Sequence, residues 1–251
     1  SEEALQQILR ALPEHLPSLL LSGANQLALK RLEQAEKNLS IVVEKQPQNI
    51  YARKLLVSTF LMGKQGHKAL EGVEAALKMA PEDSQLLALG GEALMQINDF
   101  AKAQQYFEKA SKLDPKNSGI RTSLGVSRLA VGETDTAMAD LESATDLDPK
   151  RFQADTILIA AHLGRREYDE ALKAIQGLEQ KQPTNPLTYN LKGAAFLGKK
   201  DSAAARKSFE RALELDPTYF PATMNLAQMD ASEKKFDAAK QRFEAILSKD
   251  K

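Results

Sequence analysis

The residues that could carry catalytic or metal chemistry are few and scattered. The three histidines are His15, His67 and His162, and none lies at metal-ligand spacing from another. There is no cysteine, which excludes disulfides, thiolate zinc sites and a thiol nucleophile. The sequence contains no glycine-rich phosphate loop, nucleophile elbow or HExxH pattern. We therefore expect no enzymatic activity, no metal and no cofactor.

Two acidic groups could still assist chemistry. Asp155 lies seven residues before His162, on the same face of an expected helix, and is a candidate partner for its imidazole. Asp146 and Asp148 form an acidic pair, but they lie at the end of an expected helix beside Pro149. The 34-residue repeat described below already accounts for acidic residues at this helix end, so we assign the pair no catalytic role.

Charge and hydropathy exclude further classes. Lys and Arg total 34, Asp and Glu total 34, and the net charge is zero. Such a chain has no overall basic character with which to attract nucleic acid. No apolar run reaches the 18 or so residues of a membrane span.

A proline recurs every 34 residues, and an alanine recurs in the same register. Spacing that holds over seven copies indicates internal repeats, which decide how the rest of the chain is interpreted. The prolines are Pro13, Pro47, Pro81, Pro115, Pro149, Pro183 and Pro217, and the alanines are Ala35, Ala69, Ala103, Ala137, Ala171, Ala205 and Ala239.

Each repeat is expected to form two helices. In the third repeat, Ser84 is the expected cap of the first helix. Asn98 and Asp99 then interrupt the apolar pattern and begin the second helix. That helix must end before Pro115, because proline disfavours helix at the preceding residue and has no N–H to donate.

Two columns of residues are expected to form the core. The alanine column is placed where the two helices of a repeat approach most closely. A column of large residues, four positions later, is expected to fill the space between one repeat and the next. These residues are Leu39, Val73, Phe107, Leu141, Ile175, Phe209 and Phe243.

This pattern resembles the tetratricopeptide repeat (TPR) family. The Ala-Phe-Ala part is present as Ala103, Phe107 and Ala110 and again as Ala205, Phe209 and Ala212, and the first-helix glycine as Gly23, Gly91, Gly125 and Gly193. The resemblance implies an all-α fold, a right-handed α-solenoid of helix-turn-helix repeats. The expected segments are 1–15, the second helix of a truncated repeat, followed by repeats at 16–49, 50–83, 84–117, 118–151, 152–185, 186–219 and 220–251.

The TPR resemblance also implies a binding surface. First helices of the family line a concave groove that holds a partner peptide, with the second, fifth and ninth positions of each repeat facing inward. A family clamp for C-terminal carboxylates is absent, because Ser58 stands where Asn is needed after Lys54. The implied peptide-binding residues are Tyr51, Lys54, Ser58, Gln85, Glu92, Thr122, Gln153, Thr156, Asn190 and Gln228.

Three short stretches, at 185–195, 218–222 and 238–243, are similar to a narrower group. This group is the TPR lipoproteins of bacterial PEP-CTERM protein-sorting and exopolysaccharide systems. The likeness implies a lipid-anchored parent protein with this chain on the periplasmic side of a membrane. The partial first repeat and the lack of a polar capping helix suggest that the chain is part of a longer array.

Two alternatives to a peptide-binding scaffold stay open. The chain could be a spacer or oligomerisation rod that associates end to end through apolar terminal faces. It could also be a glycan-binding accessory module of polysaccharide export. A glycan site normally presents aromatic platforms, yet Tyr51 is the only aromatic residue among the inward positions.

Overall fold

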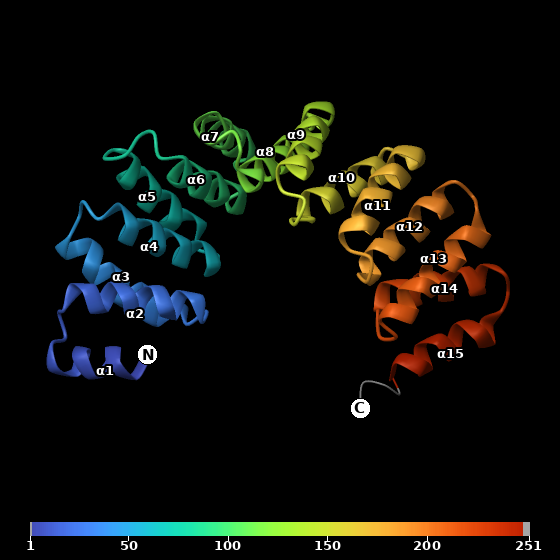
Figure 1. Cartoon of the computed structure of the whole chain (residues 1–251), viewed down its shortest axis with the longest axis horizontal. Coiled ribbons are helices and arrows are strands. Elements are labelled where there is room, and N and C mark those ends of the chain that lie inside the picture. The colour runs from blue at the N-terminus through green and yellow to red at the C-terminus, as the bar shows by residue number, and fades with distance from the viewer. Residues whose placement is uncertain (1, 248–251) are drawn as a thin grey trace. The chain divides into compact units, whose positions relative to one another are not determined.

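The computed structural model describes residues 2–247, and this range folds into fifteen α-helices with no strand (Figure 1). The predicted all-α class is confirmed. Ser1 and residues 248–251, which belong to the first and last predicted segments, lie outside the described residues. The helices are α1 Glu2–Ala11, α2 Leu16–Ala28, α3 Leu32–Lys45, α4 Ile50–Met62, α5 Gly66–Leu77, α6 Ser84–Gln96, α7 Phe100–Leu113, α8 Ser118–Ala130, α9 Thr134–Leu147, α10 Gln153–Gly164, α11 Tyr168–Lys181, α12 Pro186–Gly198, α13 Ser202–Leu215, α14 Phe220–Ser232 and α15 Phe236–Leu247.

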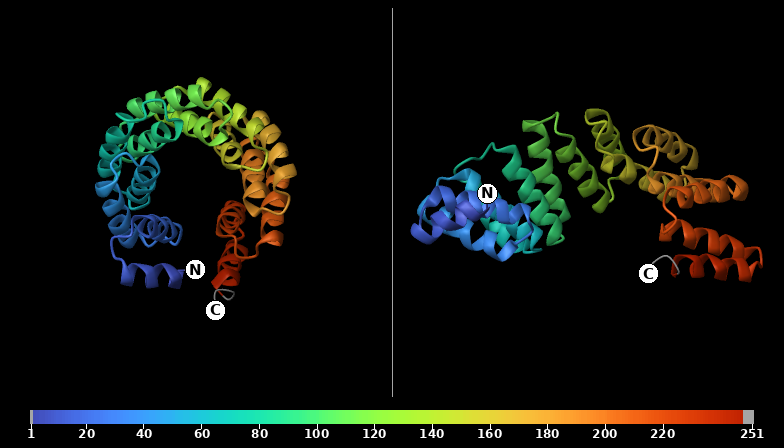
Figure 2. Two further views of the ribbon diagram at one scale, coloured as in Figure 1. Left: turned by 60° about the vertical axis from the view of Figure 1, so that its left-hand side comes forward. Right: turned by 60° about the horizontal axis from the view of Figure 1, so that its bottom comes forward.

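The chain divides into two compact units, which we call unit 1 (residues 1–140) and unit 2 (residues 141–251). Within each unit the helices follow one another side by side in chain order (Figure 2). In unit 1, α2 packs on α3, α4 on α5 and α6 on α7. In unit 2, α10 packs on α11, α12 on α13 and α14 on α15. Each pair is a helical hairpin that also packs on the next pair in its unit.

The prolines of the 34-residue ladder follow the second helix of each hairpin. Helix α3 ends two residues before Pro47, and α7 ends two residues before Pro115. The proline ring cannot continue a helix, and it also disfavours helical geometry at the residue before it. The ladder therefore marks the joints between successive hairpins.

The cap of the third predicted repeat lies one residue earlier than expected. Asp83, not Ser84, is the N-cap of α6, and its carboxylate accepts hydrogen bonds from the backbone N–H groups of Gln85 and Leu86, each at 3.0 Å. Ser84 is the first residue of the helix. Both residue types can cap, so sequence alone did not separate them. Asn49, Asn117 and Asn185 cap α4, α8 and α12 in the same way.

The turn inside each hairpin contains one residue whose backbone has the left-handed conformation, with a positive φ. Asn98 has a φ of 63°, and Gly132 has a φ of 87°. Asparagine and glycine adopt this geometry most easily, whereas lysine and arginine do so at a cost. The left-handed residues recur at the 34-residue spacing of the prolines and are Lys30, Lys64, Asn98, Gly132, Arg166, Lys200 and Lys234.

The alanine column is almost completely buried. Every member from Ala35 to Ala205 has 0% exposure, whereas Ala239 in α15 is half-buried. The column of large residues behaves alike, with Phe107 at 1% and Phe209 at 0%, but Phe243 at 39% exposure. These columns form the core, as the apolar periodicity predicts.

A glycine of the first helix makes room for the large residue of the second. A Cβ placed on Gly91 would lie 2.6 Å from the ring of Phe107. Phe107 also packs with Leu124 of α8, in the next hairpin. The large column therefore fills two spaces: the one inside its own hairpin and the one beside the following hairpin.

Arg128 and Asp230 occupy the same position in their first helices, where some other repeats have an apolar residue. Arg128 of α8 is bonded to Asp140 of α9 (2.5 Å) and to Glu108 of α7 (2.9 Å). In unit 2, Asp230 of α14 is held by Arg206 at 2.6 Å and by an arginine of α15, Arg242. These charges are largely removed from water, and each is paired, as burial of charge requires.

His162 occupies the same position in α10. It is 7% exposed, and its Nδ1 lies 2.9 Å from an Oε of Glu167, the residue before α11. The prediction that Asp155 partners this imidazole is wrong, because the Oδ1 of Asp155 accepts a hydrogen bond from Lys181 at 2.8 Å instead. Asp155 is also buried, with 5% exposure.

Candidate peptide-binding groove

The first helices of unit 1 form a continuous row. Helix α2 contacts α4, α4 contacts α6, and α6 contacts α8, in addition to the contacts inside each hairpin. We call the surface of α4, α6 and α8 the first-helix face of unit 1. It carries a hollow of about 360 Å³. The residues that line it are Tyr51, Lys54, Leu55, Ser58, Gln85, Ala88, Leu89, Asn117 and Ile120.

Four of the predicted binding residues meet at this hollow. Tyr51, Lys54 and Ser58 come from α4, and Gln85 comes from α6. Their spacing along α4 places all three on one helix face. Tyr51 is 60% exposed, so its ring is open at the edge of the hollow rather than packed in the core.

The single cation of the hollow is neutralised. Lys54 lies 2.7 Å from a carboxylate oxygen of Asp83 and donates a hydrogen bond of 2.8 Å to Gln85 Oε1. Burial alone would raise the pKa of Asp83, but the hydrogen bonds from Lys54 and from the N–H groups of Leu86 and Gln85 outweigh it and hold the pKa below its usual value. The site is therefore electrically balanced and makes no demand for an acidic ligand.

The floor of the hollow is apolar. Ile120 is 5% exposed, and Leu55 and Leu89 are half-buried beside it. An apolar ligand side chain placed here would leave water at about 25 cal/mol per Å² of buried surface. The hydroxyl of Ser58 and the amide of Gln85 lie at the same opening and could bond an extended backbone.

Glu92 lies further along α6, outside this hollow. The residue is exposed, yet desolvation of its carboxyl by the surrounding protein raises the pKa above its usual value. It forms no ion pair with the described residues. A carboxylate that is accessible, crowded and unpaired is available to a ligand donor.

Thr122 is placed differently from the other predicted residues. It is 7% exposed, and its hydroxyl donates a 2.7 Å hydrogen bond to the carbonyl of Ser118 in its own helix. Its only donor is therefore already used inside α8. Because the side chain is also buried, we leave Thr122 out of the site proposed below.

The remaining predicted residues lie on first helices of unit 2. Gln153 and Gln228 are exposed, on α10 and α14. Thr156 donates to the carbonyl of Gln153 at 2.8 Å. Asn190 of α12 accepts a 3.0 Å hydrogen bond from Asn225 of α14, which links the two first helices. None of these four is among the residues that line the hollow in unit 1 or the cleft of α9, α10 and α11 described below.

The sequence reasoning missed the apolar part of the hollow. Leu55 and Leu89 directly follow Lys54 and Ala88, at the sixth position of their repeats, which is not among the three inward-facing positions of the family. A helix presents a face wider than one residue per turn, so apolar neighbours of the predicted positions were the available signal. Asn117 was missed because it precedes α8 and is its N-cap.

No cluster of three or more residues suited to metal binding occurs within residues 2–247. In the same range, no helix is long and apolar enough to cross a membrane.

Comparison with known families supports the repeat assignment. Three family models, all described as tetratricopeptide repeat, match residues 85–117, 122–186 and 196–251. Between them they cover more than half of the sequence. The chain is built from tetratricopeptide repeats. No curated protein gave a match by sequence.

Solved TPR structures share the fold. A structure reported as a functional characterization of pilF from Pseudomonas aeruginosa has a TM-score of 0.69 and 20% identity, and the match covers 85% of this chain and 97% of that one. A tetratricopeptide repeat protein from Parabacteroides merdae has a TM-score of 0.66 and 17% identity, over 98% of this chain and 91% of that one. YrrB, described as a TPR protein with an unusual peptide-binding site, has a TM-score of 0.60 and 16% identity, over 74% of this chain and 96% of that one. The structural similarity establishes the solenoid fold of the TPR protein. At identities this low it shows nothing finer.

Proposed function

We propose that this TPR protein is a non-catalytic scaffold that binds a partner peptide or protein along its first helices. The observation that carries the proposal is the hollow in unit 1, where Tyr51, Lys54, Ser58 and Gln85 meet over an apolar floor. The TPR fold itself favours partner binding, and the peptide-binding site named for the similar YrrB points the same way. The site is already formed in the free chain, which lowers the ordering cost of binding.

The chemistry of the hollow favours an extended peptide with an apolar anchor. The anchor side chain would lie on Leu55, Leu89 and Ile120 and against the ring of Tyr51. Ser58 and Gln85 would bond the peptide backbone beside it. Because Asp83 neutralises Lys54, the anchor should carry no charge.

A peptide array of extended sequences tests this proposal. We expect wild-type protein to retain peptides with a central Leu, Ile, Met or Phe, and to lose them when that residue becomes Asp. Tyr51→Ala should abolish retention with little change in the melting curve, because Tyr51 is 60% exposed. Leu89→Glu should also abolish retention, with some loss of stability because Leu89 is half-buried against the core. The matched control is Gln228→Ala, at an exposed first-helix position of unit 2. Retention that survives both unit 1 variants would reject the hollow as the site.

The finer assignment concerns cellular context. The stretches at 185–195, 218–222 and 238–243 support a place in bacterial envelope protein sorting or exopolysaccharide assembly. On that proposal the parent protein is a lipoprotein and this chain faces the periplasm. Metabolic labelling of the full-length parent with a radioactive fatty acid, followed by membrane fractionation, tests it. An unlabelled parent in the soluble fraction would contradict it.

A second candidate function is end-to-end self-association. Helix α15 has no buried residue and exposes Phe236 (67%), Leu247 (69%) and Phe243 (39%). Ile8 of α1 is 41% exposed. An apolar surface of this kind is typical of a contact site. Light scattering over a concentration series should show a rising mass that Phe236→Ser and Leu247→Ser together abolish, and a constant monomer mass would reject this function.

A further inference from the structure

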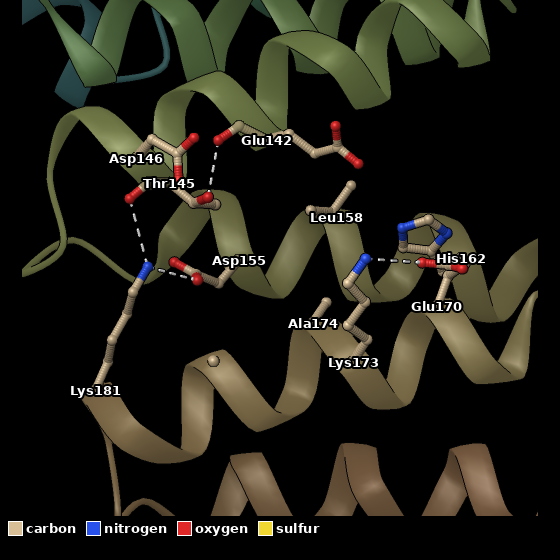
Figure 3. Close-up of a pocket in the computed structure, with 11 residues that line it drawn as sticks. Glu142, Thr145, Asp146, Asp155, Leu158, His162, Glu170, Lys173, Ala174 and Lys181 are labelled. Carbon is tan, nitrogen blue, oxygen red and sulfur yellow. Dashed lines mark hydrogen bonds and ion pairs between the residues drawn. The ribbon is translucent and has the colours of Figure 1, made fainter.

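A second cleft lies within unit 2. It is lined by α9, α10 and α11 and has a volume of about 490 Å³ (Figure 3). Asp155 and Lys181 lie at one end of it, and His162, Glu170 and Lys173 lie at the other. Its lining comes from α9 and α11, the second helices of their hairpins, and from three residues of α10, and it shares no residue with the hollow of unit 1.

Two small residues of α11 create the space. Ala174 occupies the position that Asp140 and Arg242 hold in other repeats, where each makes an ion pair over the first helix. Gly177 occupies the position of Arg211, and a Cβ added to it would meet no atom within 4 Å. Small residues stand at both positions in α5 as well, where they are Gly72 and Ala75, so the charged lining is what distinguishes this cleft.

The lining carries an excess of negative charge. Four carboxylates, of Glu142, Asp146, Asp155 and Glu170, face two ammonium groups. The ammonium of Lys173 is 3.9 Å from Glu170, on a side chain that is 82% exposed, so solvent screens this pair strongly. Neither Glu142 nor Asp146 forms an ion pair with the residues that the structure describes.

The carboxylate of Asp155 is incompletely satisfied. Its Oδ1 accepts a hydrogen bond from Lys181, which also donates to the carbonyl of Thr145 at 3.4 Å. Its Oδ2 is buried and has no partner among the described residues, although Asp155 is only 5% exposed. A buried, charged oxygen without a donor is unfavourable, which points to a ligand that supplies one.

We propose that this cleft binds an organic cation of the primary ammonium class. An ammonium carries three donors in different directions and suits acceptors on α9, α10 and α11 together. A guanidinium is a planar fork that prefers both oxygens of one carboxylate, and Lys181 already occupies one oxygen of Asp155. A metal ion fits less well, because the described residues contain no cluster of three metal-ligating side chains. Two sources share the ammonium chemistry: a lysine side chain of a partner protein and a free polyamine.

Titration of the isotope-labelled protein, followed by NMR at the amides of Leu158 and Ala174 in the cleft lining, tests the proposal. The probes are cadaverine, acetyl-Ala-Lys-Ala-amide and the neutral acetyl-Ala-Gln-Ala-amide. We expect the first two to bind and the third not to bind. Tighter binding of the lysine peptide assigns the site to a partner side chain, and equal or tighter binding of cadaverine assigns it to a free polyamine.

Variants of the cleft decide whether the signal belongs to it. Asp155→Asn should weaken binding by about tenfold or more, because it removes the buried charge. Gly177→Leu should block the cleft and leaves every carboxylate unchanged. This variant keeps the test decisive if Asp155→Asn fails to fold. Gly177→Ala is the matched control and should bind like wild type, as should Tyr51→Ala on the first-helix face. Equal binding of the glutamine peptide, or full binding by Gly177→Leu, would overturn the proposal, as would no binding by either amine.

Discussion

The ring of Phe209 lies directly over the backbone of Gly193, and a Cβ added to that glycine would be 2.4 Å from the ring. The two residues face each other across the α12–α13 hairpin. The contact is repeated in α6 and α7 by Gly91 and Phe107, at the same spacing. A glycine in the middle of a helix costs stability by itself, so its presence here is explained by the ring that it admits.

Replacing glycine with alanine should have opposite effects on stability at Gly193 and at Gly177. Gly193→Ala should destabilise unit 2 by about 1–3 kcal/mol, because Phe209 is fully buried and cannot move aside. Gly177→Ala should stabilise it by up to about 1 kcal/mol, since alanine favours helix and its Cβ meets nothing. Urea unfolding of the two variants measures both changes. A Gly193→Ala protein as stable as wild type would show that the ring is not held in place.

The hairpin turns provide a second prediction. Gly132 has a φ of 87° and no atom within 4 Å of an added Cβ, so only backbone strain opposes a side chain there. Gly132→Ala should therefore cost about 1–2 kcal/mol. Lys64→Gly, at the equivalent turn of another repeat, should cost less or even stabilise, because glycine relieves the strain at a φ of 58°. Thermal melts of both variants decide, and equal losses would contradict the strain argument.

The large-residue column yields a third prediction. Phe209→Ala should cost about 3–5 kcal/mol, because the side chain is 0% exposed and its loss leaves a cavity. Phe243 occupies the same repeat position but is 39% exposed, so Phe243→Ala should lower the free energy of unfolding far less. Denaturant unfolding measures the difference. Similar losses at both positions would mean that Phe243 is covered in solution, which is the result expected of self-association.

A fourth prediction concerns pH. Desolvation raises the pKa of the Glu92 carboxyl, so the folded chain holds its proton more tightly than the unfolded chain does. The free energy of unfolding must then fall as pH rises from about 4 through the folded pKa. Glu92→Gln removes this loss, and the variant should exceed wild type in stability at pH 7 but not below about pH 4. Melting curves across this range test the sign, and a lower stability of the variant at pH 7 would contradict it.

The sequence predicted the fold through local rules. The prolines and the alanine column are set by helix geometry and close packing, which depend on neighbours a fixed distance along the chain. Asp83 was missed as the cap because Ser84 beside it is equally able to cap. The family pattern places Thr122 in the groove, but it does not show that the side chain is buried and bonded to Ser118 within α8.

Long-range polar pairs were harder to predict. Asp155 and Lys181 are 26 residues apart, and His162 bonds Glu167 across the turn between α10 and α11. Each pairing depends on which of several charged residues lies nearest after the hairpins pack. The periodicity shows that position 162 is inward but does not rank the candidate partners. The cleft of unit 2 arises in the same way, from Ala174 and Gly177, whose small size leaves no apolar pattern to detect.

The ion pairs over the first helices have a consequence for folding. Within one hairpin the first helix contributes Arg128 and the second contributes Asp140, while another hairpin reverses the signs with Asp230 and Arg242. If these two hairpins exchanged second helices, Arg128 would face Arg242 and Asp230 would face Asp140. Hairpins that share one repeat pattern could exchange helices while the chain folds. The reversed charges disfavour that exchange between these two hairpins. The ion pairs thus favour the native pairing of helices in these two hairpins.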